Sequence, residues 1–298
     1  MDRLQCMSAV VAVADCRGFA GAARKLGLSA PAVTRAVAAL EQHLGVALFV
    51  RTTRTVRLTE AGTRYVDDAR RILAELDEAD EAAAGINATP RGTLGITAPV
   101  LFGRLYVMPG IVDYLSRYPQ VAVQALFLDR VVNLIDEGLD VGVRIGELPD
   151  SSLHAVRVGQ VRRVLCASPA YLQAHGRPTR VAELSEHSLI AATGISSSPE
   201  WTFGGTGNKH SVRVQPRLAV NTNEAAITAT CAGFGIARLL SYQVVEQVAA
   251  GELERVLDDD ATALPVHVVY REGRRASAKV RSFVDLVVAR LRADASLH

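Results

Sequence analysis

The stretch FAGAARKLGLSAPAVTRAVAAL, residues 19–40, decides the fold of the N-terminal part of the chain. Its apolar residues recur at helical spacing on both sides of Gly27, which predicts two short helices joined by a tight turn. Gly27 can adopt the left-handed conformation that ends the first helix, and Ser29 is a favourable N-cap for the second. Pro31 then falls in the first turn, where its missing N–H costs nothing. The stretch therefore predicts a compact helix-turn-helix.

The second of these helices would present a polar face to its surroundings. Val33, Val37 and Leu40 fall on one side of it, which leaves Thr34 and Arg35 on the other. A hydroxyl and a guanidinium on an exposed helix suit the major groove of DNA. A plain helical hairpin is the alternative, because small alanine-rich helix pairs are common.

The next segment, LFVRTTRTVRLTEAG at residues 48–62, combines cations and hydroxyls in a run rich in β-branched residues. That composition favours a two-stranded wing over a helix. Its side chains Arg51, Thr53 and Arg54 would reach phosphates or the minor groove. Residues 1–58 hold eight Lys or Arg against three acids, a net charge of +5, whereas the whole chain carries +2. Such a local excess favours DNA through counterion release.

The sequence AARKLGLSAPAVTRAVAALEQHLGVALFVRTTRTVRLTEAG, residues 22–62, resembles the DNA-binding domain of LysR-type transcriptional regulators. The RTTR at residues 51–54 marks one large branch of that family. The resemblance implies further DNA contacts at the start of the second helix, at Ser29, Ala30 and Pro31. Ala30 stands where many members carry a polar side chain and cannot hydrogen-bond to a base. The operator sequence therefore cannot be carried over from the family.

A long helix is expected after the wing. Thr59 can cap it, and Glu60 places an acid at the positive end of its dipole. Residues 60–88 carry a net charge of −5 and an apolar seam with alternating spacings of four and three. The seam consists of Tyr65, Ala69, Ile72, Leu76, Ala79, Ala83 and Ile86. It predicts pairing with another helix, and packing within one subunit is the alternative.

The resemblance implies that this linker helix forms a homodimer, which would present two recognition helices to a near-palindromic site on double-stranded DNA. The homotetramer usual for the family is implied by the resemblance alone.

Strands alternating with helices are expected after Pro90 and Gly92, which end the helical pattern. The expected strands are residues 93–97, 121–126, 140–144, 163–167, 188–192, 212–214, 218–220 and 266–270. The expected helices are residues 102–118, 131–137, 169–175, 223–232 and 277–292. This alternation predicts parallel βαβ units in an open sheet.

Two similar α/β halves indicate a periplasmic-binding-protein-like module with a ligand cleft. Residues 127–146 and 164–176 resemble the LysR-type effector domain. The predicted fold class is therefore α/β, with a winged helix-turn-helix at residues 1–59, a linker helix at 60–89 and an effector domain at 92–298. The resemblance implies two subdomains, the first comprising residues 92–160 and 265–298 and the second comprising residues 161–264.

A small-molecule effector would bind beyond the carboxyl ends of the strands, where helix N-termini can face it. At these positions, which family members use for effectors, we predict contacts by Thr97, Ala98, Val100, Arg144 and Asn223. An ion pair of Arg144 with Asp129, Asp140 or Glu147, and a plain N-cap at Asn223, are the alternatives. Many members place hydroxyls after the first strand to hold a carboxylate. Here Ala98 and Pro99 follow that strand, which counts against an anionic effector.

No catalytic, metal or cofactor site is expected. The glycine-rich segment at residues 203–210 lacks phosphate-loop spacing and reads as a hairpin turn, beside which Trp201 and Phe203 would pack in the core. The four cysteines lack metal-type spacing and are expected to be buried thiols. No enzyme signature is present, and no apolar run reaches the ~20 residues that span a membrane.

The absence of a secretory signal predicts a cytoplasmic protein with no membrane partner. The sequence thus predicts an effector-controlled, sequence-specific DNA-binding regulator. A solute-binding-type ligand sensor whose DNA-binding role is secondary or lost is the alternative.

Overall fold

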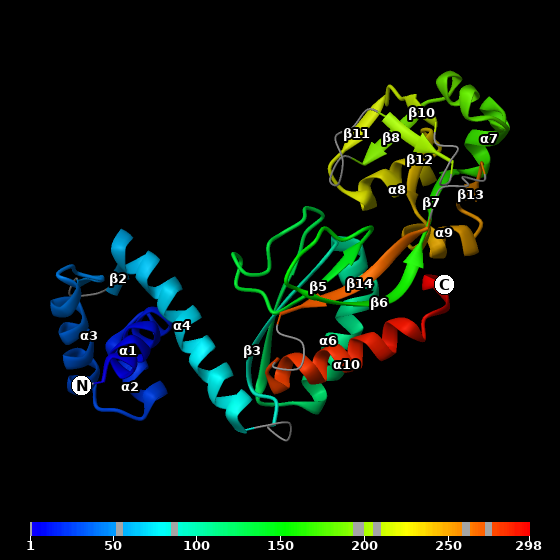
Figure 1. The fold of residues 1–298 in the computed structure, drawn as a ribbon. Helices are drawn as coiled ribbons and strands as arrows, with labels where there is room; N and C mark the ends of the chain where they lie inside the picture. The colour runs from blue at the N-terminus through cyan, green and yellow to red at the C-terminus, as the bar shows by residue number, and fades with distance from the viewer. Residues whose placement is uncertain are drawn as a thin grey trace. The chain divides into compact units, whose positions relative to one another are not determined.

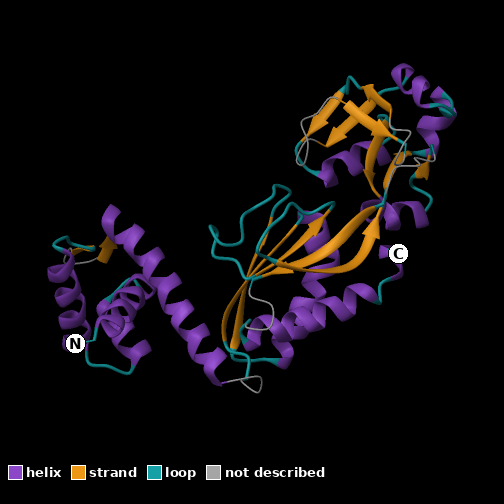
Figure 2. Cartoon of the chain, in the orientation of Figure 1, coloured by secondary structure: helices purple, strands orange, loops and turns teal. Residues whose placement is uncertain are grey.

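The computed structural model of the chain describes residues 2–51, 56–84, 89–192, 200–204, 210–257, 263–271 and 276–298. The chain divides into two compact units, Met1–Ala88 and Thr89–His298. Figure 2 shows the first unit as helices with one short pair of strands, and the second as helices and sheets. Within the described residues, every helix is too short or too polar to traverse a bilayer.

The N-terminal unit is a helix-turn-helix with a hairpin wing and a long fourth helix. Its elements are α1 (Arg3–Cys16), α2 (Phe19–Leu26), α3 (Ala30–Leu44), β1 (Phe49–Arg51), β2 (Val56–Leu58) and α4 (Glu60–Ala84). The predicted caps are confirmed. Gly27 ends α2 with a φ of 64°, the Ser29 hydroxyl accepts from the N–H of Ala32 at 3.3 Å, and the Thr59 hydroxyl accepts from the N–H of Gly62 at 2.8 Å.

The apolar seam of α4 divides into a buried and an exposed part. Ala69 is fully buried, as is its neighbour Val66, in the core that α1, α2 and α3 also form. Ile72 and Leu76 keep 42% and 38% of their surface exposed. Among the seam residues that the structure describes, packing within one subunit therefore explains only the first ones; the side chain of Ala83 and the residue Ile86 lie outside the described part of the chain.

The first sheet of the C-terminal unit contains β4 (Val121–Phe127), β3 (Gly92–Ala98), β5 (Val141–Ile145), β14 (Leu264–Tyr270) and β6 (His154–Val161), in that order. The helices α6 (Met108–Arg117) and α10 (Ala278–Arg292) pack together against this sheet (Figure 1). The short helix α5 (Val100–Phe102) and the π-helix η1 (Gly103–Val107) precede α6, and η5 (Ala295–Leu297) follows α10.

The second sheet has the order β11 (Leu218–Val220), β8 (Leu189–Ala192), β12 (Ile236–Leu240), β7 (Arg163–Ala167) and β13 (Glu254–Arg255). Its helices are α7 (Pro169–His175), η2 (Val181–Glu186), α8 (Asn223–Cys231), η3 (Ser241–Val244) and α9 (Val245–Ala249). The hairpin of β9 (Glu200–Phe203) and β10 (His210–Arg213) confirms the expected turn, whose residues 205–209 lie outside the described ones. Trp201 and Phe203 are buried in the core, as predicted.

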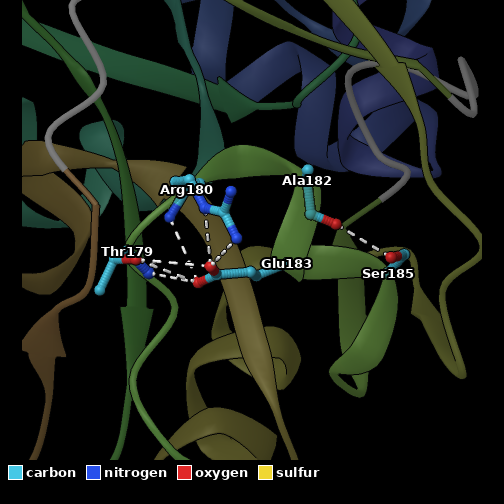
Figure 3. A network of polar contacts seen from close by, with 5 residues as sticks. All are labelled: Thr179, Arg180, Ala182, Glu183 and Ser185. Atoms are coloured by element: carbon cyan, nitrogen blue, oxygen red, sulfur yellow. Dashed lines mark hydrogen bonds and ion pairs between the residues drawn. The ribbon is translucent and has the colours of Figure 1, made fainter.

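A carboxylate fixes the short connection before β8. Glu183 in η2 accepts from the N–H of Thr179 at 2.7 Å and from Nε of Arg180 at 2.9 Å, while the Ser185 hydroxyl donates to the carbonyl of Ala182 (Figure 3). These hydrogen bonds, led by that of Thr179, lower the pKa of Glu183 to about 2. The connection is therefore held by an ionised side chain.

Two expectations for these units are wrong, and a third holds in part. The expected parallel pairs are present, since β3 runs parallel to β4 and β5, and β8 runs parallel to β11 and β12. Both sheets also contain antiparallel pairs, because β14 runs antiparallel to β5 and β6, and β12 runs antiparallel to β7. The helix expected at residues 131–137 is a series of turns. There Asn133 accepts from the N–H of Ile135 at 3.0 Å, a local bond that competes with a helix. The cysteines are not all buried, since Cys16 is exposed and Cys231 is half-buried.

Candidate DNA-binding surface and effector site

The N-terminal end of α3 forms an exposed surface. Ser29, Ala30, Pro31 and Arg35 are all exposed, and Thr34 is half-buried. The Thr34 hydroxyl donates to the carbonyl of Ala30 at 3.0 Å, so towards DNA it offers an acceptor. The α3 residues predicted to contact DNA therefore share one accessible end of the helix.

The hairpin wing is fixed to α3 by the side chain of Glu41, which no sequence pattern had singled out. Oε1 of Glu41 accepts from the N–H groups of Leu48 and Phe49, at 2.8 and 3.1 Å. The wing therefore begins at a defined position relative to α3. Arg51 closes β1, but its side chain and the residues Thr53 and Arg54 lie outside the part of the chain that the structure describes.

Two of the five predicted effector residues, Val100 and Asn223, meet at a carboxylate that was not predicted to have this role. Oδ1 of Asp129 accepts from the N–H of Val100 at 3.0 Å, and its Oδ2 accepts from Nδ2 of Asn223 at 3.4 Å. The pKa of Asp129 is raised, chiefly by burial and also by the charge of Glu224, despite the opposing hydrogen bond from Val100. The N-cap of α8 is Thr222, whose hydroxyl accepts from the N–H of Ala225, so the alternative of a plain N-cap at Asn223 is wrong.

Thr97, Ala98 and Arg144 lie deeper in the first subdomain. Thr97 and Ala98 are fully buried in β3, and the Thr97 hydroxyl has no hydrogen-bond partner among the described residues. Arg144 donates to the carbonyls of Val132 and Val143, and none of the ion pairs between described residues includes it. Burial lowers the pKa of Arg144. Its guanidinium is therefore half-buried without an acidic partner in the described part of the chain.

A cavity of about 200 Å³ lies next to Val100 and Asn223, the first residues of α5 and α8. Leu101 and Glu224 line it from those two helices, and Tyr242 lines it from η3. The cavity thus adjoins the predicted effector residues without including them.

An exposed helix-turn-helix with a hairpin wing, followed by a two-sheet module with a cavity between its halves, defines a ligand-binding regulator of transcription. The sequence profile of the bacterial regulatory helix-turn-helix protein of the lysR family matches residues 4–63. The profile of the LysR substrate binding domain matches residues 87–292. The chain belongs to the LysR family of transcriptional regulators.

Individual relatives are similar in sequence to this chain over nearly its whole length. An HTH-type transcriptional repressor of Pseudomonas aeruginosa is 34% identical, with 97% of this chain and 92% of the relative covered. DmlR of Escherichia coli is 33% identical, with 92% and 90% covered. The solved structure of CrgA from Neisseria meningitidis has a TM-score of 0.62 at 29% identity, with 96% and 98% covered. That of AphB from Vibrio cholerae has a TM-score of 0.63 at 26% identity, with 97% and 99% covered. These relatives support a transcriptional regulator over a solute-binding sensor.

Proposed function

We propose that the protein binds a near-palindromic operator as a homodimer through α3 and the wing, and that an effector at the subdomain junction controls this binding. The observation that carries the proposal is the exposed N-terminal end of α3 beside a wing held by Glu41. In this arrangement Arg35, Thr34 and Ser29 address base edges, while Arg51, Thr53 and Arg54 address the backbone or minor groove.

The exposed part of the α4 seam supports the homodimer. Ile72 and Leu76 leave apolar surface uncovered in the single chain, as a helix with a partner would. Assembly of two dimers into a tetramer is the form that the family implies. The protein would act in the cytoplasm, where its DNA is, and by binding rather than by catalysis.

Effector control would work through the contact between the two subdomains. Asp129 of the first subdomain and Asn223 of the second are joined by a hydrogen bond, so a ligand that rearranges this contact changes how the halves are held. A ligand can shift such an equilibrium only by its difference in affinity for the two arrangements.

A gel-shift titration with the DNA immediately upstream of the protein's own gene tests the proposal. At ~150 mM salt, where non-specific contacts weaken, we expect a discrete shift that resists competitor DNA. Arg35→Ala should weaken that specific binding by ~1–3 kcal/mol, the value of a base contact. Arg54→Ala should instead lower the salt slope by about one, as for a lost phosphate contact.

Arg117→Ala is the matched control, because Arg117 lies in the other unit and pairs with Asp113. It should leave operator affinity unchanged. Equal losses in Arg35→Ala and Arg117→Ala would contradict the assignment of Arg35.

A further inference from the structure

The groups that an anionic effector would use at the subdomain junction are already occupied by the protein. The carboxylate of Asp129 accepts from the Val100 N–H and the Asn223 side chain, at 3.0 and 3.4 Å. An incoming anion would have to displace Asp129 and would then lie close to its charge and to that of Glu224. Like charges at such a distance repel. This junction is therefore unfavourable for a second anion.

The adjoining cavity, in contrast, has a lining that favours a cation. Its lining includes the apolar side chains of Leu101 from α5, Leu105 from η1 and Ile227 from α8, together with the buried Tyr242 and the polar side chains of Thr228, Gln243 and Gln247. Glu224 is half-buried in the wall, and Glu246 is exposed at the edge. The walls thus combine an apolar surface, an aromatic ring and two carboxylates.

The two carboxylates are not neutralised by the protein. None of the ion pairs between described residues includes Glu224, Glu246 or Arg104, which is the one basic residue among the described residues that line the cavity. Arg104 and Glu246 are both exposed, so water and salt screen both charges, whereas Glu224 is half-buried and close enough to Asp129 to raise the pKa of that carboxyl. The cavity therefore carries negative charge that a ligand can compensate.

We propose that this cavity binds a small organic ammonium ion, with its charge facing Glu224 and Glu246 and its carbon chain against Leu101 and Ile227. An ammonium group donates three hydrogen bonds, enough for both carboxylates, and Tyr242 adds a ring that a cation can approach. The inference rests on the proposed effector control and names the chemical class of the effector.

The test is isothermal titration calorimetry of the full-length protein with butylammonium chloride, sodium butyrate and butyramide at equal ionic strength. These probes share a carbon chain and differ in charge. We expect saturable binding of butylammonium alone, with a Kd on the order of 1 mM because so small a ligand forms few contacts. The amino acid 4-aminobutyrate separates two sources of the ammonium group. If 4-aminobutyrate binds more tightly than butylammonium, the effector is an amino acid. If it binds more weakly, the effector is a simple amine.

Variants locate the site. Glu224→Gln and Glu246→Gln should each weaken butylammonium binding about tenfold or more, since each removes a charged hydrogen-bond acceptor. Glu252→Gln, an exposed acid outside the lining, should bind as the wild type does. Glu246 is itself exposed, so its variant remains informative if Glu224→Gln fails to fold.

Three outcomes would overturn the inference: no binding of butylammonium, butyrate binding as tightly as butylammonium, or butylammonium affinity unchanged in both variants. The gel-shift titration separates this failure from failure of the proposed function. A protein that binds its operator but no ammonium ion keeps the proposed function. A protein that binds ammonium but no operator keeps the cavity site and loses its role in transcription.

Discussion

Arg70 of α4 donates to Asp15 of α1 through a bond of 2.6 Å between Nη2 and Oδ1, and Lys25 of α2 lies 2.9 Å from the other carboxylate oxygen. One carboxylate thus joins three helices of the DNA-binding unit. Burial by itself would raise the pKa of Asp15, but the hydrogen bonds and charges of Lys25 and Arg70 outweigh it and hold the pKa below its ordinary value of 3.8.

Asp15→Asn should loosen α4 from α1. The side chains of Asp15 and Arg70 are 32% and 48% exposed, so the expected loss is only ~0.5–1 kcal/mol. Hydrogen exchange of the α4 amides in the full-length protein measures it. Asp68→Asn is the control, because the partner of Asp68 is Arg71 on the same helix. Equal exchange in the two variants would show that Asp15 does not hold α4.

The same carboxylate predicts a pH dependence. Because folding lowers the pKa of Asp15, its stabilisation is complete above 3.8 and is lost as pH falls below that value through the folded pKa. Amide protection of α4 should therefore decline in acid in the wild type more steeply than in Asp15→Asn. Parallel declines would contradict this origin.

Gly62 allows α4 to begin directly against the wing. A Cβ at this position would lie 2.0 Å from the carbonyl oxygen of Leu48, a backbone atom that cannot rotate away. Gly62→Ala should therefore displace the wing and cost ~1–3 kcal/mol or more. Thermal unfolding and operator affinity both report the change. Gly18→Ala is the control, since its added Cβ would come no closer than 3.9 Å to Cys16.

The fold was predictable where its signals are local. Gly27, Ser29 and Thr59 act within a few residues of their own positions, and each ends or begins a helix as expected. Asp129 could not be singled out, because its partner Asn223 is 94 residues away and only the folded chain brings them together. The helix expected at residues 131–137 did not form although Val132 and Leu134 are buried, because the local bond from the Ile135 N–H to Asn133 competes with it.

The cysteines differ enough in surroundings to be told apart chemically. Burial raises the pKa of Cys166 to about 11 from an ordinary 9.0, which lowers its thiolate fraction about 100-fold. Cys16 is exposed and Cys6 is buried. Under native conditions iodoacetamide should therefore modify Cys16 first, as mass spectrometry of digested protein would show. Modification of Cys166 at the rate of Cys16 would contradict the buried environment, and urea should make the two rates similar.

Asp129 predicts a pH dependence opposite to that of Asp15. Burial raises the pKa of Asp129 above 3.8, and Glu224 adds to the rise despite the opposing bond from Val100. Folding therefore favours the neutral carboxyl, so the contribution of Asp129 to stability is present below 3.8 and is lost as pH rises through the folded value. Asp129→Asn is neutral at every pH and can still accept from the Val100 N–H.

The stability of Asp129→Asn should accordingly fall less than that of the wild type as pH rises above 3.8. Thermal unfolding midpoints measured across this range provide the comparison. Asp136→Asn, at an exposed position in the same loop, controls for the general loss of one negative charge. If both variants follow the wild-type curve, Asp129 is as well solvated as an ordinary surface acid, and an anion could then displace it from Val100 and Asn223. If only Asp129→Asn departs from the curve, the junction already holds a carboxylate at an energetic cost, which disfavours a second one.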